Sequence, residues 1–183
     1  MKRTIASLFI ALFASTALYG TPAQVVLLRH AEKPEEGDTL SQRGFERAAA
    51  LVPFFIDPPN ADKFKPCAAV YAPRSSKNHR STRSIQTVSA LANAFEVPFY
   101  VKYIVEEVEE LAKEIMDEPS YEGKMVLICW QHAHIAMIAE AVGVSNPEKW
   151  PKKAFDRVWV IDFVGDKVSS FKDLPQHLLP GDS

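Results

Sequence analysis

Four side chains of this sequence could together bind and transfer a phosphoryl group: Arg29, His30, Arg83 and His132. An arginine guanidinium binds phosphate oxygens in pairs and stays charged. A neutral histidine can act as a nucleophile and divide one displacement into two easier steps. A positive cluster also stabilises the charge that develops on the transferring group. Chemistry of this kind needs no metal and no cofactor.

The elements that would position these side chains are short, buried strands. An apolar run bounded by turn signals is typical of a strand covered on both faces. Such runs alternate with segments of helical periodicity, which predicts a three-layer α/β/α fold with a mainly parallel central sheet. The carboxyl ends of parallel strands lie at one edge of a sheet, where open α/β sheets bind ligands. The predicted strands are Gln24–Arg29, Cys67–Tyr71, Pro98–Val101 and Val126–Trp130.

Helices are expected between these strands, and a hairpin is expected after them. Ser41 is a good N-cap for a first helix that ends at about Phe55. The other helices are expected to begin at about Thr82, to include Val108–Ile115, and to cover Ile135–Val142. Val158–Phe163 and Val168–Phe171 predict an antiparallel hairpin at the edge of the sheet. The tail, Leu174–Ser183, is rich in proline and polar residues and is expected to fray or to lie on the surface.

The first residues have the pattern of a secretory signal peptide. Lys2 and Arg3 precede an apolar stretch, Ile5–Leu18, which small residues follow. This stretch is too short for a membrane-spanning helix. We therefore expect residues 1–23 to be a signal peptide, residues 24–183 to form a single domain, and the protein to be periplasmic or secreted. No cysteine lies near the expected cleavage point, so no stable membrane anchor is predicted.

The overall charge limits the class of partner. The formal net charge is -2 and 47% of the residues are hydrophobic, so nothing favours nucleic acid or an anionic membrane surface. The expected partner is a small-molecule phosphate ester or a phosphorylated ligand. Cys67 and Cys129 could pair in an oxidising compartment, or both could be small buried core residues.

Leu28–Glu32 resembles the RH(G/A)E signature of the histidine phosphatase (phosphoglycerate-mutase-like) superfamily, in its small phosphatase branch. Three further segments are similar to other elements of that family, and they occur in the family's order. They are Leu40–Gly44 with Arg47 and Ala48, Arg83–Thr87, and Val126–Ile135 with His132 after the strand. Together the matches cover residues 24 to 143.

The resemblance implies a metal-independent phosphomonoesterase. It implies that His30 is the nucleophile, which forms a phosphohistidine, and that Arg29, Arg83 and His132 line the phosphate pocket. Glu32 lies inside the first motif and is expected to orient its neighbours beside the substrate. His132 and His134 form His-x-His, but no carboxylate or cysteine is placed to complete a metal site with them.

The sequence departs from the family pattern at two places. Residues 73–80 look like an insertion over the site, where Arg80 and its neighbours could contact substrate or form a solvated loop. Ala133 follows His132, so the family's His-Asp form of proton donor is absent. Glu106 and Glu107 are the nearest candidate acids, although the acidic run that they begin is more typical of a solvated helix face. A binding module that holds a phosphorylated ligand without turnover is the alternative function.

Overall fold

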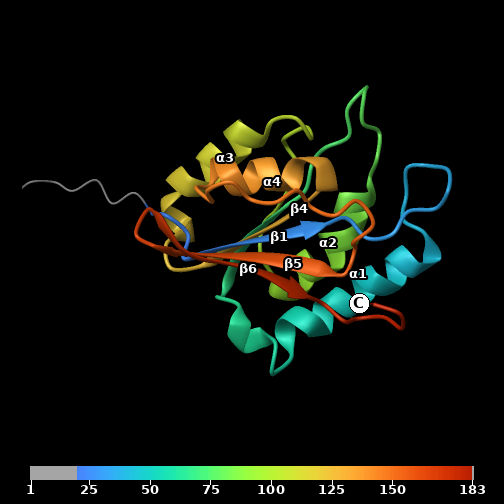
Figure 1. Ribbon diagram of the computed structural model, residues 1–183, viewed down its shortest axis with the longest axis horizontal. Coiled ribbons are helices and arrows are strands. Elements are labelled where there is room, and N and C mark those ends of the chain that lie inside the picture. The colour runs from blue at the N-terminus through green and yellow to red at the C-terminus, as the bar shows by residue number, and fades with distance from the viewer. Residues whose placement is uncertain (1–19, 183) are drawn as a thin grey trace, which may run out of the picture.

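The computed structural model describes residues 20–182 and contains one six-stranded sheet of order β3-β2-β4-β1-β5-β6 (Figure 1). The four strands β1 to β4 are parallel, whereas β5 and β6 form an antiparallel hairpin that adds to β1. This confirms the predicted mainly parallel sheet with its edge hairpin. Most of the expected signal peptide lies outside the described residues. The strands are β1 (Gln24–Arg29), β2 (Cys67–Tyr71), β3 (Phe99–Tyr100), β4 (Met125–Trp130), β5 (Arg157–Val164) and β6 (Lys167–Pro175).

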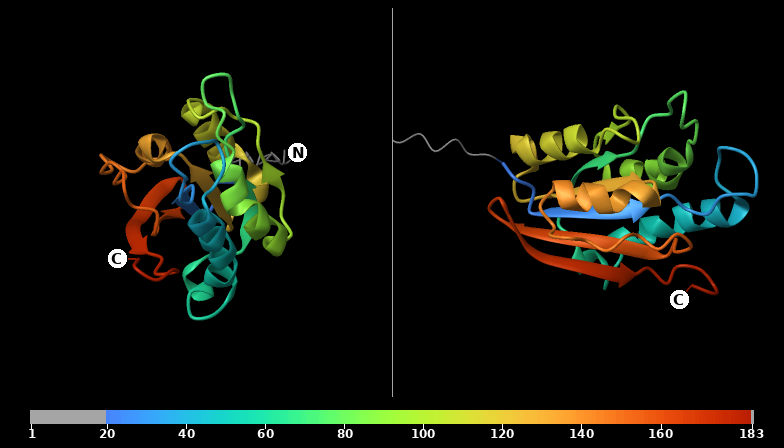
Figure 2. Two further views of the ribbon diagram at one scale, coloured as in Figure 1. Left: turned by 90° about the vertical axis from the view of Figure 1, so that its right-hand side faces the viewer. Right: turned by 45° about the horizontal axis from the view of Figure 1, so that its top comes forward.

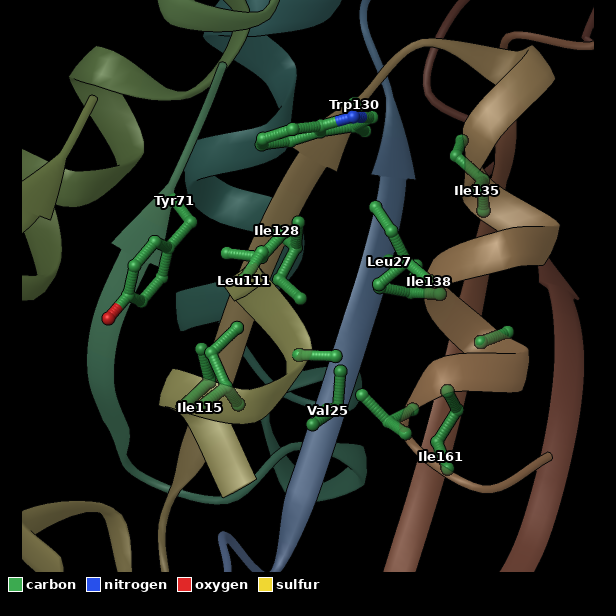
Figure 3. Close-up of a cluster of buried hydrophobic side chains, with 14 of the residues drawn as sticks. Val25, Leu27, Tyr71, Leu111, Ile115, Ile128, Trp130, Ile135, Ile138 and Ile161 are labelled. Carbon is green, nitrogen blue, oxygen red and sulfur yellow. The ribbon is translucent and has the colours of Figure 1, made fainter. Parts of the chain in front are cut away.

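The helices cover both faces of the sheet, which confirms the three-layer arrangement (Figure 2). Successive side chains of a strand point to opposite faces. Val26 and Leu28 therefore pack in the core with the first two helices, while Val25 and Leu27 pack with the last two (Figure 3). The described residues form the α-helices α1 (Gln42–Ile56), α2 (Arg83–Phe95), α3 (Val108–Asp117) and α4 (His132–Ala141), and 3-10 turns at Ala61–Lys63 and Pro119–Tyr121. Within residues 20–182, no helix has both the length and the apolar character to cross a membrane.

The start of α1 lies directly against the segment that follows β1. Ser41 is the N-cap, and its hydroxyl accepts a hydrogen bond from the backbone N–H of Gly44 at 3.1 Å. The backbone N–H of Ser41 in turn donates to the carbonyl of Glu32 at 2.9 Å. A Cβ at Gly44 would stand 2.3 Å from that same carbonyl, so only glycine permits this approach. The Leu40–Gly44 motif therefore anchors the helix to the residues after His30.

Two elements differ from the sequence expectation. Helix α4 begins at His132, three residues before the predicted start at Ile135, because its polar first turn carries no apolar periodicity. Strand β6 extends to Pro175, into the predicted tail. The tail does not fray: Gln176 is buried, and the side chain of Asp182 is 4% exposed. An ion pair with α1 holds this segment in place, and proline content alone could not reveal it.

The two cysteines are both free. Cys67 lies beside Met125 at the start of β4, and Cys129 lies four residues further along that strand. This separation is about 13 Å of extended chain, which is beyond the reach of a disulfide.

Candidate active site

The side chains predicted to bind phosphate gather at the carboxyl ends of the parallel strands. Arg29 is the last residue of β1, next to Trp130 of β4, and the N–H of His30 donates to the carbonyl of Trp130 at 3.1 Å. His132 opens α4 and Arg83 opens α2. The loops after β1 and β2 project from this end of the molecule (Figure 1).

His30 is buried and neutral. Its Nδ1 lies 2.7 Å from the carbonyl oxygen of Ala31. A carbonyl can only accept, so Nδ1 carries the proton and Nε2 keeps its lone pair. Burial, with the nearby Arg29, Arg83 and His132 acting in the same direction, lowers the pKa of His30 to about 4. All three groups act on the pKa of one imidazole, in agreement with their positions at the end of β1 and at the starts of α2 and α4.

Arg29 is held by the segment that precedes β5. Its Nη1 donates to the carbonyls of Lys152 and Ala154, at 2.7 and 3.0 Å, and its Cζ lies 3.7 Å from the centre of the Phe155 ring. Its Nε is buried and has no hydrogen-bond partner among the described residues. Burial lowers the pKa of Arg29 to about 10, so the guanidinium remains charged at neutral pH. The guanidinium is therefore a buried cation with one unsatisfied donor.

Arg83 binds the loop that follows β1. Its Nε donates to the carbonyl of Thr39 at 3.0 Å, and its Nη2 donates to the carbonyl of Gly37. Two other residues of the Arg83–Thr87 motif act on the same region. The amide oxygen of Gln86 accepts from the N–H of Leu40, and the hydroxyl of Thr87 accepts from the N–H of Ala31, both at 2.9 Å. The motif therefore holds the backbone around His30 as well as supplying a cation.

His132 is half-buried, and burial lowers its pKa, with the charges of Arg29 and Lys152 acting in the same direction. Trp130, the last residue of β4, is 1% exposed. Its Nε1 donates to the carbonyl of Val105 at 2.9 Å, so it is a core residue.

Glu32 forms ion pairs rather than facing solvent. Its carboxylate lies 2.7 Å from Nη2 of Arg47, and it also pairs with Arg43 at 3.2 Å. Arg47 is buried and contacts Asp182 on its other side, at 2.7 Å. This arrangement fits the expected role of orienting neighbours. Arg47 stood in the second motif, whereas nothing in the sequence pointed to Asp182.

The two candidate acids lie in different surroundings. Glu107 is half-buried, and its Oε2 accepts from the backbone N–H of Ile104 at 2.8 Å. Glu106 is exposed, and its Oε1 lies 2.8 Å from Nδ1 of His79. Burial lowers the pKa of His134, and the charge of Glu106 acts on it in the opposite direction. Glu106 therefore lies near the first turn of α4, while Glu107 stabilises its own turn.

The insertion over the site is attached to the segment after β3. The backbone N–H of Arg74 donates to the carbonyl of Tyr103 at 2.7 Å, and its Nε donates to the carbonyl of Lys102 at 2.9 Å. The contact between His79 and Glu106 closes the same junction. Arg80 remains exposed. Phe155 is the main contact that sequence reasoning missed, because an aromatic residue in a loop belongs to no periodic pattern.

Within the described part of the chain, no three His, Cys, Asp or Glu side chains are grouped so that they could hold a metal ion.

The solved structures that match this chain in a structural comparison include the following two. One is a candidate phosphohistidine phosphatase, SixA, from Agrobacterium tumefaciens, with 17% identity and a TM-score of 0.47; the alignment covers 82% of this chain and 97% of that one. The other is a candidate alpha-ribazole-5'-phosphate phosphatase from Escherichia coli K-12, with 12% identity and a TM-score of 0.48; the alignment covers 83% and 96% of the two chains. No family model and no curated protein matches the sequence. The resemblance to the histidine phosphatase superfamily therefore rests on the four sequence motifs.

Proposed function

We propose that the protein is a phosphatase of the histidine phosphatase type, which hydrolyses phosphate monoesters through a phosphohistidine on His30. One observation carries the proposal. The neutral imidazole of His30 lies near Arg29, Arg83 and His132, and the buried Nε of Arg29 has no hydrogen-bond partner among the described residues. A buried donor without a hydrogen bond costs about 1–3 kcal/mol. A phosphoryl oxygen would supply the missing acceptor.

The reaction would proceed in two displacements. Nε2 of His30 attacks phosphorus, the N–P bond forms, and the ester P–O bond breaks as the alcohol oxygen leaves. Water then attacks the phosphohistidine, the N–P bond breaks, and inorganic phosphate is released with the imidazole restored. Arg29 and Arg83 would stabilise the charge on the phosphoryl oxygens in both steps. The residues named so far need no metal or other cofactor for this chemistry.

The leaving alcohol needs a proton, because an unprotonated alkoxide leaves poorly. Of the two candidate acids, Glu106 is the one that we retain in the proposal. Its carboxylate lies beside His79, near the first turn of α4, whereas a backbone hydrogen bond engages the carboxylate of Glu107. The substrate class that we propose is a small-molecule phosphate ester, with specificity set by the loop of residues 72–82.

We also propose that the enzyme acts after export, in the periplasm or outside the cell. The support is the sequence pattern of residues 1–23, with its basic start and apolar stretch. Expression of the full chain with a C-terminal tag tests this point. A mature chain that begins near residue 21 or 24 in the periplasmic fraction is the expected result, and an uncleaved cytosolic chain would contradict it.

The central experiment traps the phosphorylated enzyme. Rapid quench with a labelled phosphate monoester should give protein-bound phosphate that is stable in base and labile in acid. His30→Ala should abolish both the label and the turnover of sugar phosphates, nucleotides and aryl phosphates. His177→Ala replaces an exposed histidine and is the matched control. Wild-type protein that never labels, together with a His30→Ala variant of undiminished activity, would reject the mechanism.

A binding module is the second candidate, and the Ala133 that follows His132 favours it, since the family's His-Asp acid is absent there. This alternative predicts saturable binding of phosphate or vanadate with no hydrolysis across the same substrate panel. Turnover that His30→Ala abolishes would exclude it.

A further inference from the structure

The segment between α4 and β5 takes part in the site, although no motif includes it. The ring of Phe155 lies under the guanidinium of Arg29, with 3.7 Å between Cζ and the ring centre. The same ring lies 6.1 Å from the imidazole of His30, measured between ring centres. A guanidinium over an aromatic face is attracted by the ring quadrupole, most strongly where water is excluded. Phe155 therefore contacts Arg29, which ends β1, and His30, which begins the loop after it.

Three residues of this segment hold one guanidinium. The carbonyls of Lys152 and Ala154 accept both hydrogen bonds of Nη1, and Phe155 supports the plane. These contacts remove one end of the guanidinium from ligand binding and leave Nε without a partner. A planar fork that is fixed in this way loses little rotamer freedom when an anion binds.

The segment is itself firmly attached to the core. Trp150 is buried, and its Nε1 donates to the carbonyl of Ala154 at 3.0 Å. Its ring packs against Trp159 of β5, with 5.1 Å between centres. The carbonyl of Ala154 thus accepts from both Trp150 and Arg29. The position of Phe155 follows from these anchors rather than from a free loop.

Behind the ring there is open space. A cavity of about 570 Å³ lies on this flank, and Ala154, Phe155 and Glu32 line it together with residues of α1 and of the tail. The ring of Phe155 is a surface against which Arg29 rests.

We infer that Phe155 is a positioning residue, which fixes the orientation of the Arg29 guanidinium for the phosphoryl group bound at His30. This inference rests on the proposed function. If it is correct, Phe155 contributes to the affinity for anions only by positioning Arg29.

The test compares ring and non-ring side chains at position 155. Phe155→Leu and Phe155→Met keep the apolar bulk of the side chain but lose its aromatic face. Phe155→Tyr keeps the aromatic face. We expect vanadate to bind about tenfold more weakly to the first two variants, within the range of a desolvated cation–ring contact. Phe155→Tyr should stay within about twofold of wild type. Phe95→Leu, which replaces a ring packed against Phe55 at the other end of α2 from Arg83, is the matched control and should change nothing.

A double-mutant cycle separates positioning from general loosening. In an Arg29→Gln background, Phe155→Leu should weaken vanadate binding by less than about twofold, because the group through which it acts is gone. A tenfold loss that persists in that background would overturn the inference, as would a Phe155→Leu or Phe155→Met protein that binds vanadate normally. Vanadate binding is measured by calorimetry and needs no turnover. If His30 forms no phosphohistidine, the proposed function is refuted, but the effect of Phe155 on vanadate affinity can still be measured.

Discussion

Oδ1 of Asp182 lies 2.7 Å from Nη2 of Arg47, although 135 residues separate them in the chain. Both side chains are almost completely buried, and Glu32 pairs with the same guanidinium from the other side. The end of the chain therefore helps to hold the glutamate of the first motif, two positions after His30. Buried charges are stable only when they are paired and hydrogen-bonded.

Asp182→Asn tests this contact. Loss of one partner leaves the buried Arg47 with Glu32 alone, so the free energy of unfolding should fall by about 1–3 kcal/mol in a urea titration. Arg47 holds the pKa of Asp182 well below its usual range. The contribution of Asp182 to the free energy of unfolding is therefore fully present above the pKa that its carboxyl has in the unfolded chain. It is lost as the pH falls through the lower pKa of the folded protein. Glu148→Gln alters an exposed carboxylate and should leave stability unchanged; equal effects of the two variants would contradict the assignment.

His30 should remain neutral to an unusually low pH. Its pKa is about 4 in the folded protein, against an ordinary value of 6.5. The acid limb of kcat/KM for an aryl phosphate should therefore fall near pH 4. Between pH 6.5 and 4 the unfolded chain binds a proton at this position that the folded chain does not, so acidification through that window reduces stability. NMR titration of the imidazole gives the value directly, and a midpoint near 6.5 would refute it.

Glu106→Gln and Glu107→Gln should affect different substrates. If Glu106 protonates the leaving group, its loss should slow alkyl phosphates about 100-fold or more and p-nitrophenyl phosphate much less, within the range for general acid catalysis. Glu107→Gln should slow neither class selectively, since its carboxylate accepts a backbone hydrogen bond. Steady-state kinetics over a series of leaving groups gives the comparison. If Glu106→Gln slows alkyl phosphates and p-nitrophenyl phosphate by the same factor, Glu106 is not the general acid.

His79→Ala should loosen the 72–82 loop. The contact between His79 and Glu106 joins this loop to the segment after β3, together with the contacts of Arg74. We expect faster backbone amide exchange within residues 75–80, with no change in the strands. Lys77→Ala removes an exposed cation from the same loop and provides the control. Unchanged exchange in His79→Ala would show that Arg74 alone holds the loop.

A reductant should leave the melting temperature unchanged. Cys67 and Cys129 are free and lie at different levels of the sheet. Melting the air-exposed protein with and without dithiothreitol checks this, alongside a Cys67→Ser variant. A reductant-dependent decrease would reveal a disulfide that the structure does not contain.

The sheet could be predicted from the sequence because its central strands are buried on both faces. The apolar run before Arg29 has no polar alternation, and the structure places β1, which contains it, between β4 and β5 with all six residues of the strand buried. Four such runs separated by amphipathic helices limit the topology, and the gathering of Arg29, His30, Arg83 and His132 follows from parallel strand ends.

The contacts around that cluster could not be predicted, because they depend on residues outside any periodic pattern. Asp182 looks like part of a polar tail, and Phe155 looks like an isolated aromatic residue in a loop. Helix α4 begins at His132 rather than Ile135, since polar side chains in a first turn obscure the start of an apolar stripe. Each of these depends on where distant segments meet, and that is a property of the folded chain alone.

The strand order has a consequence for how activity is acquired during synthesis. Strand β1 emerges early, yet its neighbours are β4 and β5, and Arg29 is supported by Lys152, Ala154 and Phe155. A nascent chain that has passed residue 140 holds every side chain of the proposed chemistry, but not the segment that supports Arg29. Non-local pairing of this kind also folds slowly. Catalytic competence would then arise as one late event, and a polypeptide halted before residue 150 would carry the nucleophile without the means to use it.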